Sequence, residues 1–168
     1  MLNKISEITK WEIIEFCFIA VTGTLLHFVY EWTGQSFVAA IFAPVNESTW
    51  EHLKLLFMPA FLFTLVQEAV IGKQYPYLIT DKGKAVLLGM GFIVSFFYTY
   101  SGILGRNVSW VDIASFYVAA AIYTWTSQIG LRRAKKDVGL GAAIFVLTFL
   151  LFVVFTVNAP DIGLFREP

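Results

Sequence analysis

The side chains best suited to chemistry lie in residues 46–54, which read NESTWEHLK and stand between two apolar runs. His27 and Glu31 precede them, toward the end of the first apolar run. Imidazole and carboxylate groups are ligands that zinc takes in proteins, and carboxylate-rich sets also suit manganese or iron. The sequence therefore predicts a site for a divalent transition metal, with haem as a less favoured cofactor.

The spacing of these residues indicates how they would meet. His27 and Glu31 are four residues apart and share one helix face, as do Glu47 and Glu51. Two such pairs on adjacent helices can converge on one ion, so the predicted metal ligands are His27, Glu31, Glu47, Glu51 and His52. His52 lies about 100° around the helix from Glu51, so one ion need not take both. In the haem alternative, His27 and His52 hold the iron from both sides.

A helix cap is the simplest alternative for the same stretch. Ser48 and Glu51 fit the capping-box pattern, in which Ser48 accepts from the amide of Glu51 and Glu51 reaches back to the amide of Ser48. Asn46 can cap in place of Ser48. In this alternative Lys54 pairs with Glu51 and Glu31 holds His27. A cap does not need Glu47 or His52, and the presence of these additional polar residues favours a functional site.

The elements that position these residues are predicted from composition. The chain of 168 residues is 58% hydrophobic and 14% charged, whereas soluble domains are about 45–50% apolar and about 25% charged. The apolar residues gather in runs near the roughly 20 residues that a membrane helix needs. We predict an all-α integral membrane bundle in one transmembrane domain over residues 1–168. Its five spans are expected at about 11–32, 48–71, 85–104, 110–131 and 139–157.

The structure of the segments outside the spans can also be predicted. Residues 37–44 are apolar but too short to cross, so they are predicted to be re-entrant or interfacial. Residues 1–10 are polar and no cleavage site follows the first apolar run, which is expected to be a retained span. Residues 72–84 are predicted to form a loop with a turn at Asp81-Lys82-Gly83.

The placement of Lys and Arg predicts the orientation in the cell membrane. With five spans, nine of the 12 basic residues fall on one side: Lys4, Lys10, Lys73, Lys82, Lys84, Arg132, Arg133, Lys135 and Lys136. Lys54, Arg106 and Arg166 fall on the other side. The positive-inside rule then places the N-terminus in the cytoplasm and the C-terminus outside. The candidate metal ligands would face the extracytoplasmic side.

Charge also narrows the function. The formal net charge is zero, so no nucleic-acid partner is expected, and the bilayer is the expected surrounding. The middles of the spans carry no charge, which disfavours a proton-coupled carrier. Glu12, Glu15, Gln67 and Glu68 are expected near the inner interface. The single Cys17 cannot form a disulfide within the chain.

Residues 43–57, APVNESTWEHLKLLF, resemble the signature of a family of small prokaryotic membrane proteins of unknown function. The family pattern reads A-P-V-N-E-S-x-W-E-H-L-K. The resemblance extends to HFVYEW at 27–32, to YTYSG at 98–102, and to a tail at 163–168 that is similar to P-L-F-x-D-P. It implies the fold and the position of the site, and it supplies no activity.

Two functions remain open from the sequence. In the first, a metal-assisted enzyme acts on a lipid-type substrate, with Glu47 or Glu51 as the base for a metal-bound water. In the second, the protein binds a cofactor or an anion, or transports a small solute, without catalysis. In both cases the polar pocket opens to the extracytoplasmic side, and its predicted ligand-binding residues are Asn46, Lys54, Tyr100 and Asp112. The sequence does not predict an oligomeric state.

Overall fold

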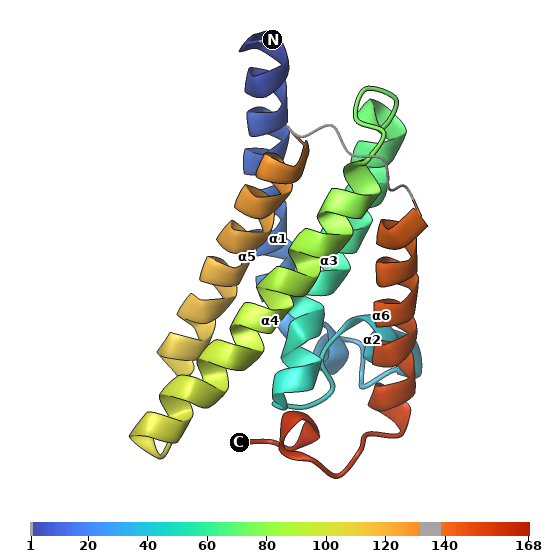
Figure 1. Ribbon diagram of the computed structural model, residues 1–168. Helices are drawn as coiled ribbons and strands as arrows, with labels where there is room; N and C mark the ends of the chain where they lie inside the picture. Colours follow the sequence, from blue (N-terminus) through green and yellow to red (C-terminus); the bar gives the residue numbers. More distant parts are fainter. Residues whose placement is uncertain (1, 132–138) are drawn as a thin grey trace.

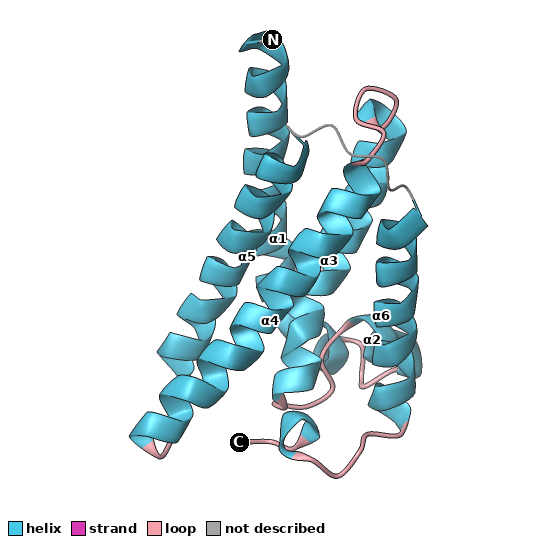
Figure 2. Cartoon of the chain, in the orientation of Figure 1, coloured by secondary structure: helices cyan, strands magenta, loops and turns pink. Residues whose placement is uncertain are grey.

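The computed structural model describes residues 2–131 and 139–168, which form helices and the turns between them. The long helices are α1 (Leu2–Trp32), α3 (Thr49–Ile71), α4 (Leu78–Leu104), α5 (Ser109–Leu131) and α6 (Gly139–Val157). The short ones are α2 (Phe37–Phe42) and the 3-10 turn η1 (Gly163–Phe165). Successive long helices run up and down, so the two termini lie at opposite ends of the bundle (Figure 1). The predicted all-α fold is confirmed for this part of the chain (Figure 2).

The predicted number of five membrane-spanning helices is wrong for the described residues. Four helices are long and apolar enough to cross a membrane: Glu7–Trp32 within α1, then α3, α4 and α6. This supports a multi-pass membrane protein. Helix α5 has the length of α3, but its many polar and amphipathic side chains lower its hydropathy. They include Asp112, Ser115, Tyr117, Tyr123, Thr124, Trp125, Thr126, Ser127 and Gln128.

Helix α3 is the central element of the bundle. It contacts α1, α4, α5, α6 and η1. In its most apolar stretch of 18 residues, 61% of the residues are buried, against 17–28% in the corresponding stretches of the other three candidate spans. Its aromatic side chains pack on α6, where the Phe57 ring centroid lies 5.2 Å from that of Phe152 and 5.9 Å from that of Phe145. Because α3 is enclosed, charged side chains on it need partners from other elements.

Helix α4 begins at Leu78, seven residues before the predicted start at 85. The turn predicted at Asp81-Lys82-Gly83 is helical instead, and the chain reverses at 72–77. Buried Tyr75 and Leu78 pack there with Ile8 and Ile71. The turn prediction failed because Lys82 is fully buried and ion-paired rather than solvated.

Close approach of α1 to α3 depends on Gly23. A Cβ atom at this position would lie 2.6 Å from the backbone oxygen of Leu55 on α3 and 2.5 Å from Cζ of Phe116 on α5. No side chain fits such a gap without displacing a helix. Gly23 is one turn before His27, so this contact sets how near His27 comes to α3.

The segment predicted to be re-entrant or interfacial contains α2, which Ser36 caps by accepting from the amide of Ala39. Helix α2 contacts α1 and α6. Its depth in a bilayer, like the cytoplasmic side of the N-terminus, stays a prediction. Of the basic residues behind that orientation, Arg132, Arg133, Lys135 and Lys136 lie outside the described residues.

Candidate metal centre

Three predicted ligands come together at one end of the bundle. His27 lies on α1, His52 on α3, and Glu47 in the turn that precedes α3. One ligand atom from each lies within 4.8 Å of the other two. The Glu47 carboxylate sits between both rings: Oε2 is 3.3 Å from Nε2 of His52, and Oε1 is 3.8 Å from Nε2 of His27. Three separate segments thus supply one cluster.

The helix cap and the cluster of candidate metal ligands use neighbouring residues of one turn. Ser48 caps α3 and accepts from the amide of Glu51 at 3.4 Å, as predicted. The predicted return contact differs, because Glu51 accepts from the amide of Val45 and Asn46 Oδ1 accepts from the amide of Ser48. These bonds fix the backbone on both sides of Glu47. Its own side chain is 64% exposed and takes no part in the cap.

The backbone sets the tautomer of neutral His52. Its Nδ1 lies 3.0 Å from the backbone oxygen of Ser48, and a carbonyl oxygen can only accept a hydrogen bond. Nδ1 therefore carries the proton, and the lone pair of Nε2 faces Glu47. Metal-bound histidines commonly donate their second ring N–H to a backbone carbonyl in this way.

His27 completes the cluster from α1. Its ring centroid is 5.4 Å from that of His52, with the two planes 35° apart. Its Nε2 faces Glu47, while its Nδ1 is buried and has no hydrogen-bond partner among the described residues. The side chains of His27 and His52 are 32% and 29% exposed, so an ion from solution can reach the three ligand atoms.

Two of the five predicted metal ligands are placed elsewhere. Glu31 is exposed and is outside the cluster of three. Glu51 is 2% exposed and pairs with Lys54 at 2.7 Å. Its other oxygen accepts from the hydroxyl of Thr156 on α6 at 3.0 Å.

The residues predicted to bind a ligand have partners within the protein. Lys54 is fully buried and also donates to Thr156 and to the carbonyls of Ala40 and Ala43. It ties α3 to α2 and α6. Tyr100 donates to Asp112, and its oxygen accepts from the amide of Val108, which closes the turn between α4 and α5. Asn46 serves the cap.

A second polar cluster lies toward the other end of the bundle, where none was predicted. Glu12 and Glu15 were expected near the interface, but both are buried and both accept from Lys82 of α4. From α5, Tyr123 donates to Glu15 at 2.6 Å and Ser127 donates to Glu12 at 3.2 Å. The three-residue spacing of the glutamates, which puts them on one helix face, was the available signal. It did not identify Lys82 as their partner.

The comparisons with known proteins place the chain in a family. A family model described as "Family of unknown function (DUF6512)" matches residues 1–168. The chain belongs to this family. Comparisons with curated proteins and with solved structures gave no match. The DUF6512 family assigns no chemistry, so the function is inferred from the two clusters.

Proposed function

We propose that this membrane protein binds a divalent transition metal ion, zinc before manganese or iron, through His27, Glu47 and His52. The observation that carries the proposal is the convergence of three ligand atoms from α1, α3 and the turn before α3 within 4.8 Å. Ligand atoms around a tetrahedral zinc ion lie about 3.3 Å apart, given bonds of about 2.0–2.1 Å. The Glu47–His52 distance already has this value. Small rotations of His27 and Glu47 would complete the set.

The ligand set favours zinc and leaves one position open. Two imidazole nitrogens and one carboxylate oxygen are the protein ligands of several catalytic zinc sites, in which water or substrate takes the fourth position. A haem held by His27 and His52 fits less well. The Glu47 carboxylate occupies the space between the two Nε2 atoms where the iron would sit.

The open position favours a metal-assisted enzyme as the second step of the proposal. A bound ion lowers the pKa of a coordinated water and so supplies a nucleophile. Of the two glutamates predicted as the base, Glu51 is held by Lys54 and Thr156. Glu47 is one of the proposed ligands and is exposed, so its second carboxylate oxygen is the one left to accept a proton from the coordinated water. A site at the end of a membrane bundle suits a lipid-type substrate. A protein that binds the ion without catalysis is the alternative, and the predicted topology puts either function on the extracytoplasmic side.

The first test is a zinc titration of the detergent-purified protein after chelator treatment, with bound metal measured by elemental analysis. We expect one zinc per chain in the wild type and at least tenfold weaker binding in His52→Ala and in Glu47→Gln. Asp161→Asn is the matched control, because it removes an exposed carboxylate that pairs with Arg166 on the tail. A single sharp gel-filtration peak identifies the variants that remain folded.

The metal proposal is refuted if folded His52→Ala and Glu47→Gln bind zinc as tightly as the wild type. It is also refuted if the wild type binds no zinc, manganese or iron above the level of the His27→Ala, Glu47→Gln double variant. The enzymatic step has its own readout: a lipid-ester substrate should turn over only with metal present. Metal binding without turnover would leave the non-catalytic alternative.

A further inference from the structure

The second cluster carries an unbalanced charge in the bundle interior. Glu12 and Glu15 bring two carboxylates to the single ammonium of Lys82, and Lys82 Nζ is 2.7 Å from Oε1 of Glu12. All three side chains are at most 5% exposed. With every group ionised, the net charge is −1, since two negative charges meet one positive charge. Unpaired charge inside a membrane bundle is strongly unfavourable.

One atom identifies where a compensating group would bind. Both oxygens of Glu15 and the Oε1 of Glu12 accept hydrogen bonds from Lys82, Tyr123 or Ser127. The Oε2 of Glu12 is buried and has no partner among the described residues. A buried acceptor without a donor costs free energy on the order of a lost hydrogen bond or more. A hydrogen-bond donor at Oε2 of Glu12 would remove this cost, and a positively charged donor would also balance the net charge of the cluster.

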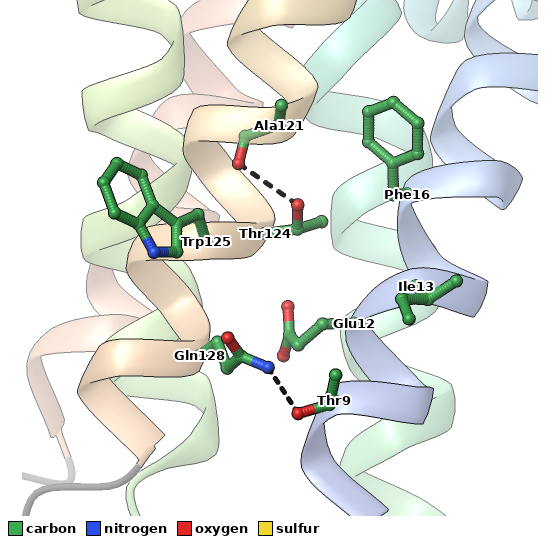
Figure 3. Close-up of a pocket in the computed structure, with 8 residues that line it drawn as sticks. All are labelled: Thr9, Glu12, Ile13, Phe16, Ala121, Thr124, Trp125 and Gln128. Atoms are coloured by element: carbon green, nitrogen blue, oxygen red, sulfur yellow. Dashed lines mark hydrogen bonds between the residues drawn. The ribbon is translucent and has the colours of Figure 1, made fainter. Parts of the chain in front are cut away.

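Glu12 also lines a pocket. The pocket has a volume of about 340 Å³ and lies between α1 and α5, lined by Thr9, Glu12, Ile13, Phe16, Ala121, Thr124, Trp125 and Gln128. Figure 3 shows the Glu12 carboxylate in the space between the two helices. Gln128 donates to Thr9 across one end at 2.7 Å, while Ile13, Phe16 and Trp125 give apolar walls. Pockets of this size bind small organic ligands.

The depth of the pocket restricts the ligand further. Glu12 lies at the N-terminal end of the first apolar run, one residue after its expected start at Trp11. This position corresponds to the boundary between headgroups and hydrocarbon. Ile13 and Trp125 are 59% and 66% exposed on the bundle surface, so a ligand can enter from the bilayer.

We propose that this pocket binds a lipophilic primary amine. Its ammonium group donates to Oε2 of Glu12 and balances the charge of the cluster, and its alkyl chain packs on Ile13, Phe16 and Trp125. Two kinds of molecule carry both an ammonium group and an alkyl chain: a free long-chain amine and an aminophospholipid. The site lies far along α1 from His27, and the proposal is independent of the metal centre.

The test uses the full-length protein in phosphatidylcholine nanodiscs, with ligand binding followed by native mass spectrometry. Dodecylamine and dodecanol are compared because they share the chain and differ in the charged group. We expect one dodecylamine per chain and at least tenfold weaker dodecanol binding. Glu12→Gln should weaken dodecylamine binding at least tenfold, while Glu68→Gln, which removes a carboxylate of α3, should leave it unchanged.

A second variant covers the case in which Glu12→Gln fails to fold. Ala121→Phe adds a ring at an exposed wall of the pocket without touching Glu12 or Lys82, and it should also lower dodecylamine binding at least tenfold. Exchange into phosphatidylethanolamine distinguishes the two kinds of molecule. Retained phosphatidylethanolamine on the wild type, lost in Ala121→Phe, identifies the headgroup, and its absence identifies a free amine.

The proposal is overturned if dodecylamine and dodecanol bind equally, or if Ala121→Phe binds dodecylamine like the wild type. It is also overturned if infrared difference spectra show a protonated carboxyl band that is lost in Glu12→Gln and is unaffected by dodecylamine. In that case a proton on Glu12 balances the charge, and the pocket holds no ammonium.

Discussion

Replacing Lys54 by Met tests whether the buried ion pair at the start of α3 holds the bundle end together. Lys54 and Glu51 are at most 3% exposed and lie 2.7 Å apart. The substitution keeps an unbranched side chain that is one heavy atom shorter and removes the charge. It leaves the Glu51 carboxylate buried without its cation and takes a donor from the carbonyls of Ala40 and Ala43.

The magnitude follows from this burial. Removing one partner of a buried ion pair costs about 3–5 kcal/mol, because the other charge stays uncompensated. For a chain of this size, each kcal/mol lowers Tm by about 2–4 °C. We therefore expect Lys54→Met to unfold about 6–20 °C below the wild type. Lys10→Met, which changes an exposed lysine of α1, should shift Tm by less than about 2 °C, since surface charges contribute little.

Tryptophan fluorescence during heating in detergent measures these transitions, with gel filtration of heated samples as a second probe. The double variant Glu51→Gln, Lys54→Met isolates the pair, because removing both charges is much less destabilising than removing one. It should be more stable than Lys54→Met alone. Equal Tm values for Lys54→Met and Lys10→Met, or a double variant that loses the sum of both single losses, would refute this reasoning.

Two further predictions concern the contacts that position the clusters. Gly23→Val should push α1 away from α3 and weaken zinc binding at His27 at least tenfold, because its Cβ would overlap the Leu55 backbone. Gly91→Val, with nothing within 4 Å of its Cβ, should bind zinc like the wild type. Tyr123→Phe should lower stability to thermal unfolding by about 1–3 kcal/mol, because Glu15 loses a buried donor. Unchanged zinc affinity in Gly23→Val, or an unchanged Tm in Tyr123→Phe, would contradict these expectations.

The sequence was most informative where function and local structure use the same short segment. Residues 46–52 carry both the cap of α3 and two of the three clustered ligand atoms, and the cap follows from local hydrogen-bond rules. His27 was identified by type and by its place at the end of an apolar run. The exclusion of Glu31 and Glu51 from the cluster could not be predicted, because it depends on which helix faces meet.

Lys82 shows why the second cluster was missed. The sequence Asp81-Lys82-Gly83 is typical of a turn in water, and the partners of Lys82, Glu12 and Glu15, are about 70 positions earlier in the chain. Only the tertiary structure reveals that the Lys82 side chain of α4 reaches both carboxylates of α1. The same cluster explains why α5 is less apolar than the other long helices. Its Tyr123 and Ser127 lower its hydropathy and donate hydrogen bonds to Glu15 and Glu12.

The sequence by itself determined the helical class, the membrane character and the start of α3, because apolar length and capping are local properties of the chain. The tertiary structure decided which charged side chains are buried together, since that depends on close approach of helices that are distant in sequence. Gly23 permits one such approach and so places His27 beside Glu47 and His52. Because α3 is enclosed, Lys54 is buried and pairs with Glu51 within the protein, although the sequence predicted that it binds a ligand.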